Sequence, residues 1–142
     1  MLNGAPITIF GDGETTRDFC YIANVVQANL LAATTDNAAA ARQVYNIAVG
    51  GRMSLNELYA ILRDLTIVRH PDVRVAPPIY ENFRAGDVRH SQASIDKAKR
   101  LLGYEPTHDV RSGLAEALSW YDERSTAALP LARNAIRVHG GE

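Results

Sequence analysis

The sequence predicts an α/β fold built from short strands and about four helices. β-Rich runs that stop at glycine or proline occur at residues 6–10, 44–48 and 73–76. Apolar residues at helical spacing mark segments that begin near residues 21, 54, 94 and 109. A chain of 142 residues suits one domain with a moderate core, which we expect at residues 1–124, followed by a partly ordered C-terminal tail at 125–142.

The composition is that of a soluble globular protein, with 46% hydrophobic and 22% charged residues. A net charge of −1 provides no basic field that would hold nucleic acid or an anionic membrane. Cys20 is the only cysteine, which excludes an internal disulfide and a cysteine-based metal cluster. No apolar run approaches the length of a membrane span, and the N-terminus does not resemble a signal peptide. We therefore expect a cytoplasmic protein.

The first strand, expected over residues 6–10, leads into a polar turn with two glycines. Arg17 stands beside Asp18 after this turn, directly ahead of a helical segment. That helix is expected over residues 21–34. Its apolar positions recur at three- and four-residue steps, which predicts an inward-facing stripe of Ile22, Val25, Val26, Leu30 and Ala33.

The middle of the chain continues with a connection, a strand and a helix. Residues 36–41 are an alanine-rich surface connection, and residues 44–48 are expected to form a buried strand that ends at two glycines. Ser54 and Glu57 have the spacing of a capping box, in which each side chain accepts from the other residue's backbone N–H. The helix that starts there should end before His70.

The remaining elements are shorter. Residues 73–76 are expected to form a strand, and residues 77–91 a loop or short strand. A helix that begins near Ser94 should stop at Gly103, because glycine readily adopts the left-handed conformation that ends a helix. A last helix begins near Asp109 and precedes the tail.

Several kinds of catalytic and cofactor sites lack their sequence signatures. No G-x-G-x-x-G loop is present that could approach a dinucleotide pyrophosphate, and no tyrosine has a lysine four residues later as general-base partner. The four histidines are scattered without clustered carboxylates, so we expect structural or solvated roles for them. His90 and Ser91 adjoin but lack an acid partner for a hydrolase triad. We therefore predict no catalytic residue, no cofactor-binding residue and no metal ligand in this chain.

Two arginine-bearing turns remain as candidate binding elements. One carries Arg17 beside Asp18, and the other carries Arg84 and Asp87 around Gly86, which lets the backbone turn sharply. Arginine presents its donors in a rigid fork that suits phosphate oxygens, and aspartate can accept from ribose hydroxyls. The turns therefore suit a nucleoside diphosphate. A structural ion pair within each turn is the alternative that the residues leave open.

Over roughly residues 1–124, the chain resembles the C-terminal half of extended short-chain dehydrogenase/reductases. The matching motifs are GDGETTRDFCYI at 11–22, NVVQANLL at 24–31, VYNIAVG at 44–50, SLNEL at 54–58, RAGDVRHSQA at 84–93 and LLGYEP at 101–106. Together they resemble NAD-dependent UDP-sugar 4-epimerases, especially the bacterial group that acts on UDP-N-acetylglucosamine or its uronic acid. Two positions depart from this group: Ala23 replaces a usual acidic residue, and Phe10 stands where asparagine is frequent.

The resemblance implies substrate-binding roles for four residues. Arg17 and Arg84 would bind the UDP diphosphate, and Asp87 would bind the ribose. Ser91 would lie beside the 2-substituent of the sugar. Serine is small there and leaves room for an N-acetyl group, whereas tyrosine would fill that space.

The resemblance also implies what lies outside this chain. Relatives carry about 180–200 residues ahead of this point, including the glycine-rich NAD loop and the Tyr-x-x-x-Lys pair. The parent protein would use NAD to invert C4 of UDP-GlcNAc/UDP-GalNAc or UDP-Glc/UDP-Gal, and this chain alone, a substrate-binding lobe without the Rossmann half, would be inactive. Two alternatives stay open: a non-catalytic nucleotide-sugar-binding or assembly module, and the equivalent lobe of a dehydratase or decarboxylase.

The same resemblance predicts how the chain associates. The strand expected at residues 44–48 would pack beside the cofactor-domain sheet in relatives. Without that sheet its edge would be unpaired, which favours a homo-oligomer or strand exchange.

Overall fold

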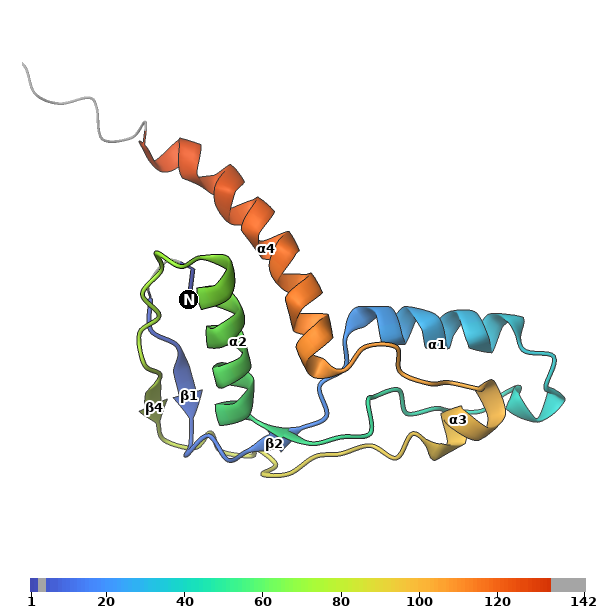
Figure 1. The fold of residues 1–142 in the computed structure, drawn as a ribbon. Coiled ribbons are helices and arrows are strands. Elements are labelled where there is room, and N and C mark those ends of the chain that lie inside the picture. Colours follow the sequence, from blue (N-terminus) through green and yellow to red (C-terminus); the bar gives the residue numbers. More distant parts are fainter. Residues whose placement is uncertain (3–4, 134–142) are drawn as a thin grey trace, which may run out of the picture.

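The computed structural model describes residues 1–2 and 5–133. Figure 1 shows the expected combination of four α-helices and short strands, so the predicted fold class is confirmed. In chain order the elements are β1 (Thr8–Phe10), β2 (Thr16–Arg17), α1 (Ile22–Thr34), the 3₁₀ turn η1 (Ala38–Ala40), β3 (Met53–Ser54), α2 (Leu55–Arg69), β4 (Ile79–Glu81), α3 (Asp96–Leu102) and α4 (Val110–Arg133).

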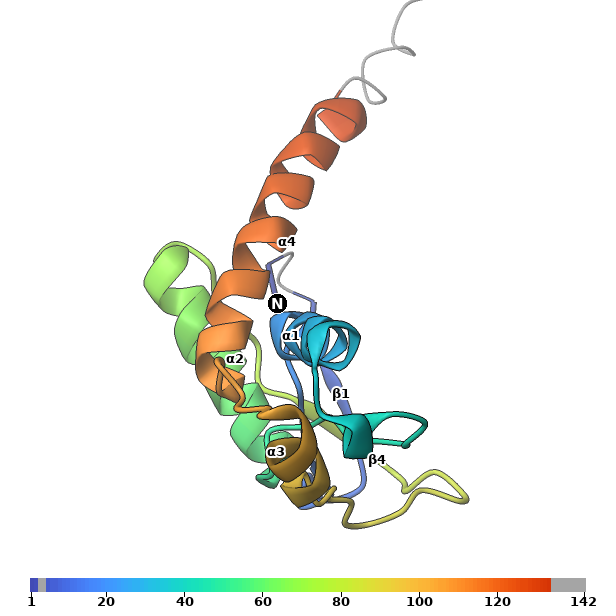
Figure 2. The ribbon, with the colours of Figure 1, turned by 90° about the vertical axis from the view of Figure 1, so that its right-hand side faces the viewer.

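The elements gather at two ends of an elongated body. In Figure 1, α2 lies beside β1 and β4 at one end, and α1 and α3 lie one above the other at the opposite end. Helix α4 starts between the two ends and runs outward, which the turned view of Figure 2 shows again. The strands β2 and β3 join the two ends.

The strands form two separate pairs, and each pair joins distant parts of the chain. β1 pairs with β4 in parallel, with Thr8 opposite Ile79. β2 pairs with β3 in an antiparallel ladder, with Arg17 opposite Met53. A single parallel bridge then joins Thr16 to His90 and draws the 84–91 segment alongside β2.

The main core lies between α1 and α3. Tyr104 is fully buried there, and its hydroxyl donates to the carbonyl of Ala48 at 2.8 Å. Small side chains around it let the two helices approach closely; the buried members of this core are Ala28, Ala40, Ala48, Ile95, Ala98, Leu102 and Tyr104.

The predicted helix ends agree with the structure where a local signal marked them. At α2, the Ser54 hydroxyl accepts from the Glu57 N–H at 3.1 Å, and the Glu57 carboxylate accepts from the Ser54 N–H at 2.7 Å, which confirms the capping box. The Ser54 N–H and the Ser54 hydroxyl, which donates to the same carboxylate at 2.9 Å, hold the pKa of Glu57 below its ordinary value. Gly103 ends α3 in the left-handed region, with φ of 68°, as predicted.

Two of the predicted strands are wrong. Residues 44–48 and 73–76 form no strand, and Val44 is 84% exposed instead of buried. A strand needs a partner as well as a β-rich composition, and no described segment forms a ladder with either run. The strand that does pair with β1 is β4, which falls in the segment predicted as a loop or short strand.

The predicted orientation of α1 is also wrong. Ile22, Val26 and Leu30 were expected to face the core but are 62%, 51% and 62% exposed, whereas Asn24 and Ala28 are buried. Periodicity shows that a helix has an apolar face, but it does not show which neighbour covers that face.

The last helix is longer than predicted. α4 continues to Arg133, past the boundary expected at residue 124. The division into a lobe at 1–124 and a tail at 125–142 therefore stays a prediction, since residues 134–142 of that tail lie outside the described residues.

Candidate binding site

One cavity brings the two predicted arginine turns together. It has a volume of about 340 Å³ and opens between β1, α2 and the turn at residues 84–87. Arg17, Arg84 and Asp87 line it, and the rest of its wall is mostly apolar. The other lining residues are Ile7, Thr8, Ile9, Phe10, Thr15, Leu55, Leu58, Tyr59 and Leu62.

Arg17 is held in place by backbone oxygens. Its Nη1 donates to the Thr16 carbonyl at 2.8 Å and to the Arg89 carbonyl at 3.5 Å. The neighbouring Asp18 turns elsewhere: its two carboxylate oxygens accept from the backbone N–H groups of Val49 and Gly50, each at 3.0 Å. The guanidinium therefore lacks the adjacent carboxylate as its partner, and the alternative of an Arg17–Asp18 ion pair is not what the structure shows.

The glycines of the turn before Arg17 are required by close contacts. Gly11 and Gly13 have φ of +84° and +78°, where other residues are strained. A Cβ on Gly11 would lie 2.3 Å from the Phe83 ring, and one on Gly13 would lie 1.9 Å from the side chain of Asn56. Side chains thus fill the space over both glycines, and this turn does not fit the pyrophosphate of a dinucleotide such as NAD.

Arg84 lies on an aromatic ring at the edge of the cavity. Its guanidinium carbon is 3.7 Å from the centroid of the Phe10 ring, a cation–π contact. The turn then closes through a hydrogen bond from the Asp87 N–H to the Arg84 carbonyl at 3.3 Å, with Gly86 at φ of +87°. This tight turn puts a cation and a carboxylate on the same rim.

Ser91 takes a different position from the other three predicted residues. Its N–H donates to the carbonyl of Thr16 at 3.2 Å, and it is exposed. It does not line the cavity, although its neighbour His90 contacts the Thr16 hydroxyl at 3.0 Å through Nδ1.

The apolar wall was missed by sequence reasoning. Phe10 was noted only as a departure from the family pattern, and Leu58, Tyr59 and Leu62 belong to the helix expected after Ser54, to which no binding role was assigned. In the structure they line the cavity, and the Tyr59 hydroxyl donates to the Ala76 carbonyl at 2.8 Å. An apolar stripe on a helix usually packs in the core, and its spacing does not distinguish a core face from the wall of a cavity.

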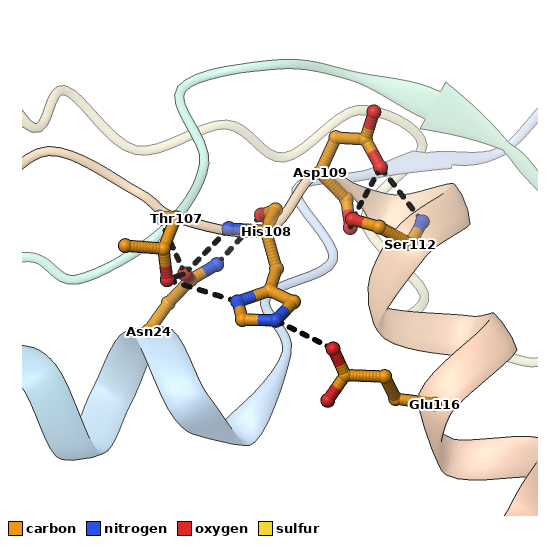
Figure 3. A network of polar contacts seen from close by, with 6 residues as sticks. All are labelled: Asn24, Thr107, His108, Asp109, Ser112 and Glu116. Carbon is orange, nitrogen blue, oxygen red and sulfur yellow. Dashed lines mark hydrogen bonds and ion pairs between the residues drawn. The ribbon is translucent and has the colours of Figure 1, made fainter.

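A polar cluster away from the cavity joins α1 to the loop before α4. Asn24 of α1 is fully buried and bonds the backbone of residues 107 and 108, as Figure 3 shows. His108 contacts Glu116 of α4 at 2.8 Å through Nε2. Asp109 accepts from the Ser112 N–H and hydroxyl at the start of α4, and these bonds lower the pKa of its carboxyl.

Each described histidine bonds another side chain through a ring nitrogen. His70 bonds Asp122 at 2.8 Å between α2 and α4, in addition to the contacts of His90 and His108. His139 lies outside the described residues. Within the described ranges, no three His, Cys, Asp or Glu residues gather in a way that could hold a metal ion.

No helix in the described part of the chain has the length and apolar character needed to cross a membrane.

Comparisons with known proteins show what the chain is similar to. A model described as "NAD dependent epimerase/dehydratase family" matches residues 1–48. The putative UDP-glucose 4-epimerase of Methanocaldococcus jannaschii is 36% identical over 120 residues, which are 84% of this chain and 35% of that protein. Over most of its length the chain is similar to part of an NAD-dependent UDP-sugar 4-epimerase. The predicted resemblance to UDP-sugar 4-epimerases is confirmed.

Solved structures of epimerases share the fold. The UDP-glucose 4-epimerase of Thermotoga maritima, solved with UDP-glucose, matches with a TM-score of 0.74 and 36% identity over 87% of this chain and 37% of that one. The UDP-N-acetylglucosamine 4-epimerase of Methanobrevibacter ruminantium, in complex with UDP-N-acetylmuramic acid, matches with a TM-score of 0.74 and 31% identity over 87% and 36%. The chain thus spans about a third of the length of these relatives.

Proposed function

We propose that this chain is the nucleotide-sugar-binding lobe of an NAD-dependent UDP-sugar 4-epimerase. The observation that carries the proposal is the convergence of Arg17, Arg84 and Asp87 on one cavity with an apolar wall. The relatives that share its fold include epimerases solved with UDP-sugars, which supports the same ligand class here.

Each part of the cavity suits one part of a uridine diphosphate. The ring of Phe10 and the side chains of Leu58 and Tyr59 offer an apolar surface for the planar base. The guanidinium groups of Arg17 and Arg84 match the diphosphate, since arginine donates charge-assisted pairs of hydrogen bonds to phosphate oxygens. Asp87 can accept from ribose hydroxyls. The cavity therefore recognises a nucleotide without any reacting group.

Binding of UDP to the 142-residue chain, measured by isothermal titration calorimetry, tests the proposal. Arg84→Gln should raise Kd by about 10–100-fold, because a hydrogen bond to a charged group contributes about 1.5–3 kcal/mol. Arg63→Gln is the matched control: Arg63 is exposed, pairs with Asp64 and does not line the cavity, so Kd should not change. Absence of UDP binding by the unaltered chain, or equal affinity of both variants, would refute the assignment.

The NAD site is proposed to lie in the rest of the parent protein. The glycine turn at residues 11–13 is filled by Phe83 and Asn56. When bound, NAD supplies the hydride chemistry at the sugar C4, and this chain contributes the grip on the nucleotide. The purified chain should accordingly produce no UDP-GalNAc from UDP-GlcNAc with added NAD, and detectable turnover would contradict this.

The preferred sugar depends on Ser91 in this proposal. Its small side chain supports a 2-acetamido sugar, that is UDP-GlcNAc and UDP-GalNAc, alongside UDP-Glc and UDP-Gal. In the intact parent protein, Ser91→Tyr should lower kcat/KM for UDP-GlcNAc much more than for UDP-Glc. An equal loss for both sugars would remove Ser91 from this role. We also propose that the protein is cytoplasmic, where such nucleotide sugars are used.

The strand edge expected at residues 44–48 is absent, so strand exchange there falls away and self-association is proposed instead through the uncovered face of α1. Ile22, Val26 and Leu30 form an exposed apolar stripe, and the relatives carry about two thirds of their length in further chain that could cover it. In the 142-residue chain alone, a second copy would take that place. Light scattering after size exclusion should show a dimer or larger species that Val26→Glu converts to monomer. A monomeric unaltered chain would refute this.

A further inference from the structure

The turn that precedes Arg17 is joined to the loop that carries Arg84 by one ion pair. Arg89 donates from Nη2 to Asp12 Oδ2 at 2.6 Å, across 77 residues of sequence. The other carboxylate oxygen of Asp12 accepts from the Glu14 N–H at 2.9 Å. We name the Asp12–Arg89 pair the clasp.

Arg89 contacts Arg17 directly and is linked to Arg84 through Phe83. The carbonyl of Arg89 accepts from the Thr16 N–H at 2.9 Å and from Arg17 Nη1 at 3.5 Å. The guanidinium carbon of Arg89 is 5.3 Å from the centroid of the Phe83 ring, and Phe83 directly precedes Arg84 in the chain. A shift of Arg89 would therefore move an acceptor of Arg17 and the backbone that presents Arg84.

The other contacts of the loop lie at its two ends: the Arg84 guanidinium lies over the Phe10 ring at one end, and two backbone bonds reach β2 at the other. Residues 84–91 are all exposed. Their backbone is tied to β2 by the Thr16 N–H to Arg89 carbonyl bond and the Ser91 N–H to Thr16 carbonyl bond, both near one end of the loop. The Arg84–Asp87 turn lies at the other end.

We propose that Asp12 is a positioning residue, which acts through Arg89 to hold the 84–91 loop against β2 so that Arg84 and Asp87 face the cavity lined by Arg17. The inference rests on the proposed function, since it concerns the same nucleotide site. Asp12 itself does not line the cavity, so its effect on a ligand is indirect.

An exposed ion pair contributes little to global stability, and this makes the proposal testable. Asp12→Asn keeps the acceptor for the Glu14 N–H and removes the charge. It should leave the urea midpoint nearly unchanged but raise the Kd for UDP about 3–10-fold. Arg89→Gln should do the same, and the double variant should be no worse than either single one. Exchanging the charges, Asp12→Arg with Arg89→Asp, should restore part of the affinity.

Asp64→Asn is the matched control. The Arg63–Asp64 pair has the same side-chain exposure as the clasp, 45% and 47%, but it joins two neighbouring residues of α2 and does not bond Arg17 or the 84–91 loop. Its loss should not change the Kd for UDP. If Asp12→Asn behaves like this control, or lowers the urea midpoint in proportion to the lost affinity, the positioning role is overturned.

Amide hydrogen exchange separates this inference from the proposed function. Without any ligand, Asp12→Asn should speed exchange at the Asp87 and Ser91 N–H groups about 3–10-fold, because both depend on an ordered loop. Failure of the unaltered chain to bind UDP would refute the proposed function, while the exchange result would still decide the clasp. Unchanged exchange together with unchanged affinity would refute the positioning role of Asp12 but leave the proposed function standing.

Discussion

Replacement of Asn24 by leucine should strongly destabilise the protein, because Asn24 is the polar centre that joins α1 to the loop before α4. Its Nδ2 donates to the His108 carbonyl at 2.8 Å, and its Oδ1 accepts from the N–H groups of Thr107 at 3.0 Å and His108 at 3.1 Å (Figure 3). Leucine has the same branched arrangement of four side-chain heavy atoms, so the variant removes the hydrogen bonds while it keeps the shape of the side chain.

The size of the effect follows from the groups left unpaired. Two backbone N–H groups and one carbonyl lose their partner, and each unsatisfied buried group costs about 1–3 kcal/mol. His108 is only half-buried, so water can reach part of this backbone, and the lower end of that range applies. The expected loss is therefore about 3–4 kcal/mol, a large share of the roughly 5–15 kcal/mol that stabilises a typical domain.

Urea unfolding followed by circular dichroism at 222 nm measures this loss. Asn29→Leu on the same helix is the control, since Asn29 is exposed and its Nδ2 makes a single bond to the Val25 carbonyl at 2.9 Å. The control should change the free energy of unfolding by no more than about 0.5 kcal/mol. A loss below about 1 kcal/mol for Asn24→Leu, or one equal to the control, would refute the assignment of Asn24 as the joint.

Three further predictions concern the turn, the core and the pH dependence. Gly11→Ala should lose about 2 kcal/mol or more in urea unfolding, because φ is +84° and Phe83 occupies the Cβ position, whereas Gly51→Ala, with open space, should be nearly neutral; equal losses would contradict this. Tyr104→Phe should lose about 1–2 kcal/mol, because a buried carbonyl loses its donor. Burial raises the pKa of Tyr104 to about 12, so the unaltered protein should lose stability as the pH rises from about 10 to about 12, and the phenylalanine variant should lack this component. Because the pKa of Glu57 is lowered in the folded state, its ionised carboxylate stabilises the fold above the pKa of the unfolded chain, and this stabilisation is lost as the pH falls below about 4. Glu57→Gln should therefore flatten the acid limb of a stability–pH curve, and an unchanged limb would argue against this.

Local signals predicted the helices well because their causes are local. The capping box of α2 and the left-handed glycine after α3 involve residues within a few positions of each other. The runs at 44–48 and 73–76 failed as strands for the opposite reason. A strand depends on a partner from another part of the chain, and β-rich composition says nothing about whether such a partner is present.

The candidate site shows the same division. Arg17, Arg84 and Asp87 could be singled out because arginine suits phosphate oxygens and aspartate suits ribose hydroxyls, and these residues stand on turns. Their convergence on one cavity could not be derived from spacing, since it depends on β1 pairing with β4. The apolar wall was invisible in the sequence because Tyr59 and its neighbours follow the pattern of ordinary core residues.

The bridge between Thr16 and His90 has a consequence for the order of folding. The two residues are 74 positions apart, and closing a loop of that length costs about 4 kcal/mol of chain entropy before any contact offsets it. Helices α1 and α2, which need only neighbouring residues, can form well before this closure. The cavity should consequently be among the last parts of the molecule to assemble, and a chain interrupted before residue 84 would carry the first of its two cations without the second.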